Sequence, residues 1–238
     1  MPMARGAARG RPPGRTGAAG LLAAVSALLV LPLAQGCGSP RYTYVKNSGE
    51  RTYFRVPAGW NRIGQHDLDQ LIAGDDPDSA AARIRPRVSW SIAYDATRPA
   101  DASHLLGLGG EEQPFVYAKI QRMTDQVRDQ ISLNLLRDAF LPVTAQARQQ
   151  AADAGQPLGD FELLRDQVLT PGGGLRGVRS VFNYRLGRQL LLQTFDVTTY
   201  ASDDGHLYEL VIRCSARCYR TRSGELDAVA RSFTVRKH

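Results

Sequence analysis

The sequence predicts an α+β fold in which an antiparallel sheet of about six or seven strands is flanked by helices. Apolar and polar residues alternate through four segments: 87–95, 178–186, 191–197 and 208–214. This alternation is typical of antiparallel strands with one covered face. Apolar residues instead recur every three or four positions in 124–141 and 223–233, which predicts helices.

The first third of the domain reads as a hairpin, a helix and two strands. The β-rich runs 41–46 and 51–56 are joined by a Ser-Gly turn, which predicts the hairpin. Apolar spacing predicts a helix over 66–73, ended by Gly74. Strand 87–95 follows, and after a glycine-rich loop the chain returns as strand 115–123.

The remaining elements are a helical pair and a meander. Thr124 is a suitable N-cap for the helix 124–141, and Pro142 stops it. The other elements expected are a helix over 144–154, strands over 160–169, 178–186, 191–197 and 208–214, a helix that starts at Ser223, and a short strand over 234–236. A single domain over 41–238 accommodates them all, since about 200 residues suit one domain.

The N-terminus has the layout of a secretory signal. Four arginines and no acidic residue precede the apolar run Leu21–Ala34. This run is too short to cross the hydrocarbon core of a bilayer as a helix, because about 14 residues span only about 21 Å. We therefore interpret residues 1–36 as a signal peptide that is removed, and a permanent transmembrane helix as the weaker alternative.

The end of this signal resembles a bacterial lipobox. Leu33-Ala34-Gln35-Gly36-Cys37 matches the pattern in which the cysteine thiol receives a diacylglyceryl group and becomes the new N-terminus. Acylation at Cys37 with fatty acids such as palmitate, followed by the short tether 37–40, predicts a protein anchored on the extracytoplasmic face of the cell membrane. The alternative is an ordinary secretory signal that leaves Cys37 as a plain cysteine.

Charge and composition restrict the partners. The formal net charge is +7, but four of these charges are the arginines before Leu21, so the chain from Cys37 carries only +3. A nucleic-acid-binding domain needs a clustered basic face, so no nucleic acid is expected. The abundance of Arg, Ala, Gly and Asp over Lys is typical of a GC-rich, actinobacterial genome.

Two further cysteines, Cys214 and Cys218, lie four residues apart. Outside the cytoplasm such a pair can oxidise, and this spacing allows a disulfide if the backbone turns there. Two free thiols are the alternative. No metal site and no cofactor are expected, because the four histidines are scattered and no second cysteine pair completes a ligand set.

We find no motif of a hydrolase, a metalloprotease or a nucleotide-binding fold. Two histidines have acidic neighbours in the sequence: His104 with Glu111 and Glu112, and His206 with Asp203 and Asp204. Sequence neighbours of this kind are usually polar turn residues, so no catalytic residue is assigned and the protein is not expected to be an enzyme.

Both ends of the domain resemble PsbP-like domains. Phe54-Arg55-Val56-Pro57-Ala58-Gly59-Trp60 is similar to their F-x-(I/V)-P-x-G-W opening, and Ser232-Phe233-Thr234-Val235 is similar to their S-F-x-V end. The resemblance implies an α/β/α sandwich with Trp60 and Phe233 in the core. The family includes photosystem II extrinsic proteins, a Ran-binding import factor and bacterial lipoproteins. It implies binding or assembly and no shared catalytic site.

Three functions follow as hypotheses. The first is a non-catalytic envelope lipoprotein that binds or stabilises another envelope component. The second is a carrier of a lipid or other apolar ligand, with a cavity between the sheet and helix 124–141 lined by Trp90, Leu135 and Phe140. The third is a hydrolase that uses His104 or His206. The sequence identifies no ligand-binding residues for the first.

Overall fold

The computed structural model describes residues 40–73, 79–110, 112–187 and 191–236. Residues Ser39–His238 form one compact unit. The predicted signal 1–36 and Cys37 lie outside the described residues. Within the described ranges, no helix is both long enough and apolar enough to cross a bilayer.

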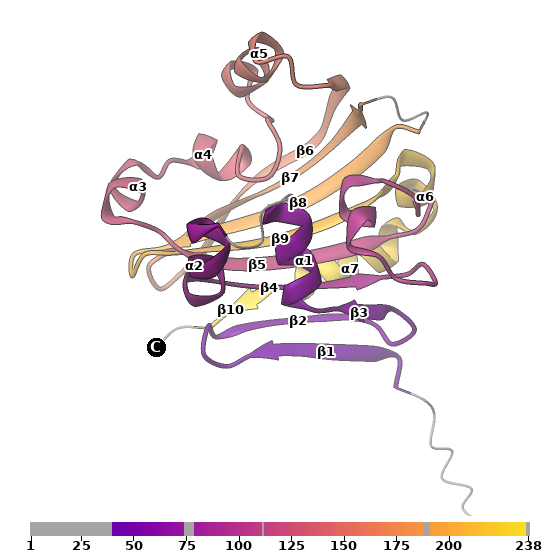
Figure 1. The fold of residues 1–238 in the computed structure, drawn as a ribbon, viewed down its shortest axis with the longest axis horizontal. Coiled ribbons are helices and arrows are strands. Elements are labelled where there is room, and N and C mark those ends of the chain that lie inside the picture. Colours follow the sequence, from indigo (N-terminus) through magenta and orange to yellow (C-terminus); the bar gives the residue numbers. More distant parts are fainter. Residues whose placement is uncertain (1–39, 74–78, 111, 188–190, 237–238) are drawn as a thin grey trace, which may run out of the picture. The chain divides into compact units, whose positions relative to one another are not determined.

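The main sheet has seven antiparallel strands in the order β3-β4-β5-β9-β8-β7-β6 (Figure 1). Its strands are β3 (Asn61–Ile63), β4 (Ser89–Asp95), β5 (Phe115–Arg122), β6 (Leu158–Gly172), β7 (Leu175–Leu186), β8 (Gln193–Ser202) and β9 (His206–Ser215). The predicted α+β class with an antiparallel sheet is therefore confirmed. Consecutive strands β6 to β9 are neighbours, as in the predicted meander, and β9 then lies beside β5 in the centre.

A smaller sheet contains β1 (Tyr42–Asn47), β2 (Thr52–Pro57) and β10 (Thr234–Val235), so the two ends of the domain are paired. The helices are α1 (Gln65–Ala73), α2 (Ala80–Val88), η1 (Ala102–Leu106), α3 (Asp125–Gln130), α4 (Leu133–Arg137), α5 (Ala145–Asp153), α6 (Ala216–Thr221) and α7 (Ser223–Ser232).

Two apolar cores form on the two faces of the main sheet. On one face, residues of α7 and the small sheet pack against β4, β5 and β9. Trp60 and Phe233 belong to this core, and both are buried, which confirms the expectation from the PsbP-like motifs. On the other face, α1, η1 and the segment after α4 supply Leu68, Leu105 and Val143. Successive side chains of a strand point to opposite faces of the sheet, so each strand contributes residues to both cores.

The prediction of one helix over 124–141 is wrong. The segment forms the short helices α3 and α4, separated by Ile131 in an extended conformation. The Ser132 hydroxyl accepts a hydrogen bond from the Leu135 amide at 3.2 Å and so starts the second helix. The apolar periodicity continues across the break, whereas the cap changes the backbone direction.

Sequence reasoning also missed the helices α2 and α6 and the short 3-10 helix η1 in the predicted loop. Helix α2 ends at Val88, so strand β4 starts at Ser89 and not at the predicted Arg87. The Ser89 hydroxyl donates to the Arg85 carbonyl at 2.9 Å and caps the end of α2. Helix α6 starts where the Ser215 hydroxyl accepts from the Cys218 amide at 3.1 Å. Serine is a favoured N-cap residue, so Ser215 was a sequence signal for the start of this helix.

A candidate binding pocket at the end of the sheet

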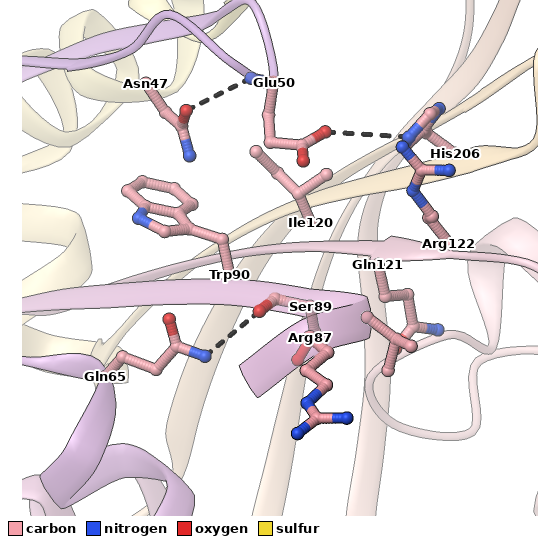
Figure 2. A pocket seen from close by; sticks show the side chains of 11 residues that line it. Asn47, Glu50, Gln65, Arg87, Ser89, Trp90, Ile120, Gln121, Arg122 and His206 are labelled. Carbon is pink, nitrogen blue, oxygen red and sulfur yellow. Dashed lines mark hydrogen bonds and ion pairs between the residues drawn. The ribbon is translucent and has the colours of Figure 1, made fainter. Parts of the chain in front are cut away.

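A polar hollow of about 200 Å³ lies where the β1–β2 turn meets the ends of β4, β5 and β9 (Figure 2). We call it the rim pocket. Its lining is mainly polar: Asn47, Glu50, Gln65, Arg87, Ser89, Gln121, Arg122 and His206, with Val88, Trp90 and Ile120. These residues come from segments that are far apart in the sequence, so the strand register forms the pocket.

The register explains which side chains meet. Trp90 pairs with Ile120 across β4 and β5, and Arg122 pairs with His206 across β5 and β9. Since alternate residues of a strand share a face, Ile120 and Arg122 are on the same side of the sheet. Trp90 packs against the core of that side and provides the apolar floor of the pocket.

Hydrogen bonds fix the polar walls. The Asn47 side chain accepts from the Glu50 amide at 3.1 Å, which holds the turn between β1 and β2. Gln65 at the start of α1 donates to the Ser89 carbonyl at 3.0 Å. Figure 2 shows these bonds on opposite sides of β4: the first holds the β1–β2 turn, and the second joins α1 to the start of β4.

The acidic groups in and near the rim pocket have partners of their own. His206 lies between two carboxylates, with Nδ1 3.1 Å from Asp204 and Nε2 3.6 Å from Glu50. Asp204 also pairs with Arg51 at 3.1 Å. Hydrogen bonds from Ser202 and His206 lower the pKa of Asp204 to about 2. Glu50 lines the rim pocket whereas Asp204 does not, and both acids contact His206.

The arginines of the pocket, in contrast, have no acidic partner in the described residues. Arg87 and Arg122 are exposed, and neither forms an ion pair with the described part of the chain. A guanidinium group has five donors in a fixed plane that matches a carboxylate or a phosphate. The pocket therefore offers two exposed guanidinium groups, Arg87 on one side of β4 and Arg122 beside His206 on the other (Figure 2), and each suits an anionic group.

A more apolar groove of about 390 Å³ adjoins the rim pocket and shares Val88, Ser89, Gln121 and Arg122 with it. Its far wall includes the exposed side chains of Ile84 and Val127. A ligand that joins an anionic group to an apolar segment would contact both hollows.

Of the predicted site residues, Cys214 and Cys218 lie together and both are buried thiols. A hydrogen bond between the two thiols raises the pKa of Cys214, to which burial adds, and lowers that of Cys218. Their closeness is compatible with the predicted disulfide, which stays a prediction. The lipidation site Cys37 lies outside the described residues.

The histidine pairs were only partly predicted. His104 does not pair with Glu112, and Glu111 lies outside the described residues. Its Nδ1 instead lies 2.6 Å from the fully buried carboxylate of Asp95, which also accepts from the Thr97 and Asp101 amides. This arrangement anchors the loop after β4. His206 does contact Asp204, but as part of the rim pocket wall.

The predicted lining of an interior cavity is wrong. Trp90 packs on the α7 side of the sheet, whereas Phe140 packs against Phe195 on the other side with ring centroids 5.9 Å apart. Leu135 is 48% exposed. The three residues therefore line no common space, because Trp90 and Phe140 lie on opposite faces of the sheet and Leu135 faces solvent.

Comparison with known proteins supports the fold alone. No protein-family model matches the chain, and no curated protein sequence matches it. Cyanobacterial PsbP from Synechocystis has a similar structure, with a TM-score of 0.51, 13% identity and coverage of 84% of this chain and 96% of the other. LpqN, involved in cell envelope biogenesis of Mycobacterium tuberculosis, gives 0.42, 14%, 81% and 89%. The Ran-binding protein Mog1p of Saccharomyces cerevisiae gives 0.43, 11%, 82% and 96%.

Proposed function

We propose that this protein is a non-catalytic, membrane-anchored envelope lipoprotein that binds an anionic group of another envelope component in the rim pocket. The observation that supports this most directly is the pair of exposed guanidinium groups, Arg87 and Arg122, which have no acidic partner in the described residues. Hydrogen bonds to charged groups contribute about 1.5 to 3 kcal/mol each, so two such contacts are enough for specific recognition.

The anchor in this proposal is Cys37. Strand β1 begins at Tyr42, so a lipid on Cys37 would hold the folded domain close to the membrane surface. We expect the protein extracted from membranes of its own host to have the intact mass of Cys37–His238 plus acyl chains. We also expect Cys214 and Cys218 to resist alkylation until they are reduced. A soluble protein without acyl chains would contradict the anchor, and thiols that react without reduction would contradict the disulfide.

The binding proposal predicts the effect of removing both open charges. In the Arg87→Gln/Arg122→Gln variant, we expect the envelope component that co-purifies from detergent-solubilised membranes to fall by more than about tenfold, since two charge-assisted contacts are lost. The yield is measured by quantitative mass spectrometry. Glutamine keeps much of the side-chain length, so the change is mainly one of charge.

The matched control is Arg83→Gln, which removes an exposed arginine of the same helix α2 that does not line the rim pocket. It should leave co-purification unchanged. If the double variant retained the same components as the wild type, the rim pocket would not be the binding site.

The carrier of an apolar ligand is the second candidate, because the apolar groove adjoins the rim pocket. Solvent extraction of the purified protein distinguishes the two. A lipid present in stoichiometric amount, and lost in the double variant, would identify the carrier function. A bound protein or glycan would identify the assembly function.

A further inference from the structure

A second pocket, of about 440 Å³, lies between α7 and the outer strands β6, β7 and β8. It is independent of the rim pocket, which lies at the end of β4 and β5. We call it the arginine pocket and define it by Arg165, Arg179, Thr198, Asp227 and Arg231. Its volume is within the usual range for small-molecule sites.

Three arginines from three elements share one carboxylate in this pocket. Arg179 of β7 lies 2.8 Å from Asp227 of α7, and Arg165 of β6 lies 3.6 Å from the same oxygen. Arg231 contacts the other carboxylate oxygen. Asp196, buried behind Arg179, is the second acid that this group contacts. Three guanidinium groups against two carboxylates leave a net positive charge.

The floor contains a polar atom that has no protein partner. Thr198 of β8 is 3% exposed, and its hydroxyl makes no hydrogen bond to the described residues. Thr198 pairs with Arg179 across β8 and β7, so both side chains point to the same face. A buried hydroxyl without a partner is unfavourable, and a ligand oxygen in the pocket would provide that partner.

An aromatic wall gives the pocket room for more than a small ion. Tyr200 lies across Gly177, where an added Cβ would be 2.4 Å from the tyrosine ring. The ring also packs against Phe233, with centroids 5.9 Å apart. Tyr200 and Leu169 thus line the pocket beside the charged groups.

We infer that the arginine pocket binds a phosphate group, carried by a small organic molecule whose body lies against Tyr200. A tetrahedral oxyanion accepts hydrogen bonds in several directions, which matches donors from β6, β7, β8 and α7. The excess positive charge favours an anion, and the Thr198 hydroxyl can donate to one of its oxygens. Inorganic phosphate has the same charged group but leaves the aromatic wall uncovered.

The test is a titration of the folded chain from residue 39 onward, without the signal, followed by NMR. The probes are inorganic phosphate, glucose 1-phosphate and glucose. We expect saturable shifts at the amides of Thr198 and Tyr200 with both phosphates, tighter binding for glucose 1-phosphate, and no shift with glucose. Equal affinity for the two phosphates would identify a site for free phosphate and overturn the organic ligand.

Two substitutions on β8 test whether the Thr198 hydroxyl itself contacts the phosphate. Thr198→Val should weaken phosphate binding about tenfold, because a hydrogen bond to a charged group is lost. Thr199→Val is the matched control: its hydroxyl is also buried and without a partner in the described residues, but it lies on the opposite face of β8. Both variants should stay folded, since valine replaces a hydroxyl that no described group uses.

A substitution that removes a negative charge from the pocket should have the opposite effect on phosphate binding. Asp227→Asn removes the carboxylate that competes with the ligand for the arginines and should strengthen binding about tenfold. The proposal is overturned if neither phosphate shifts Thr198, or if Thr198→Val and Thr199→Val have equal effects. Shifts confined to the rim pocket would also overturn it, whether or not the proposed envelope function holds.

Discussion

Replacing Arg179 with methionine is expected to lower the free energy of unfolding by about 3 to 5 kcal/mol. Asp196 is 1% exposed, and its two oxygens accept from Nε and Nη2 of Arg179 at 2.8 and 2.6 Å. The Tyr219 hydroxyl donates to it at 2.7 Å. Without Arg179, a buried carboxylate would retain this neutral donor and no opposite charge.

Urea denaturation of wild type and variant measures the loss. Arg165→Met is the control, because Arg165 is an exposed arginine of the same pocket with a long contact of 3.6 Å, and surface ion pairs contribute at most about 1 kcal/mol. The double variant Arg179→Met/Asp196→Leu should regain most of the stability, since it removes the unpaired charge. A single-variant loss below about 1 kcal/mol would mean that water reaches Asp196 and would contradict its buried pairing.

Glu209→Gln is expected to stabilise the protein by about 3 kcal/mol at about pH 8 and to have little effect at about pH 4. Glu209 is 6% exposed on β9, and its Oε1 has no hydrogen-bond partner in the described residues. Burial raises the pKa of Glu209 to about 7, although Lys119 on the neighbouring strand lowers it. Glutamine has the same shape and never ionises.

The direction of this pH effect on stability follows from the protons that Glu209 binds in the folded and unfolded states. The folded protein keeps the Glu209 proton up to about pH 7, whereas the unfolded chain releases it near the ordinary glutamate pKa of about 4.3. Below the pKa that Glu209 has in the unfolded chain, this residue therefore does not lower the free energy of unfolding. The free energy of unfolding falls as the pH rises from there towards 7. Of the groups that face it, Thr199 does not ionise, and Tyr117 has its own pKa raised mainly by burial and secondarily by Glu209.

Unfolding free energies across this pH range test the prediction. Glu162→Gln serves as the control, because Glu162 is an exposed strand glutamate and its replacement should give no gain that grows with pH. An equal gain for Glu209→Gln at both ends of the range would show that Glu209 is not held protonated by burial.

The sequence predicted every strand except β3 (Asn61–Ile63), because a covered sheet face imposes an alternation that can be recognised in a short window, whereas three residues are too few to show it. It failed where a single residue overrides the periodicity. Helix 124–141 keeps its apolar spacing through Ser132, but the serine cap interrupts the backbone. Helix α2 was missed because it contains three alanines, three arginines and a proline, which give no clear apolar stripe.

The candidate site was much less predictable. Asn47, Arg87, Arg122 and His206 come from four segments, and only the pairing of β4, β5 and β9 brings them together. Acidic neighbours in the sequence were a poor guide for His104, because its partner Asp95 lies at the end of the preceding strand. No short pattern shows that an arginine lacks a partner in space.

Site-specific photo-crosslinking in the native membrane tests binding through the rim pocket most directly. The crosslinker p-benzoylphenylalanine replaces Gln121, which lines the pocket, and in a control it replaces the exposed Leu164 on β6 at the opposite edge of the sheet. We predict one discrete adduct from position 121 that disappears with Arg87→Gln/Arg122→Gln, and none of the same mass from position 164. Identical adducts from both positions, or an adduct at 121 that survives the loss of both arginines, would contradict the proposed binding site.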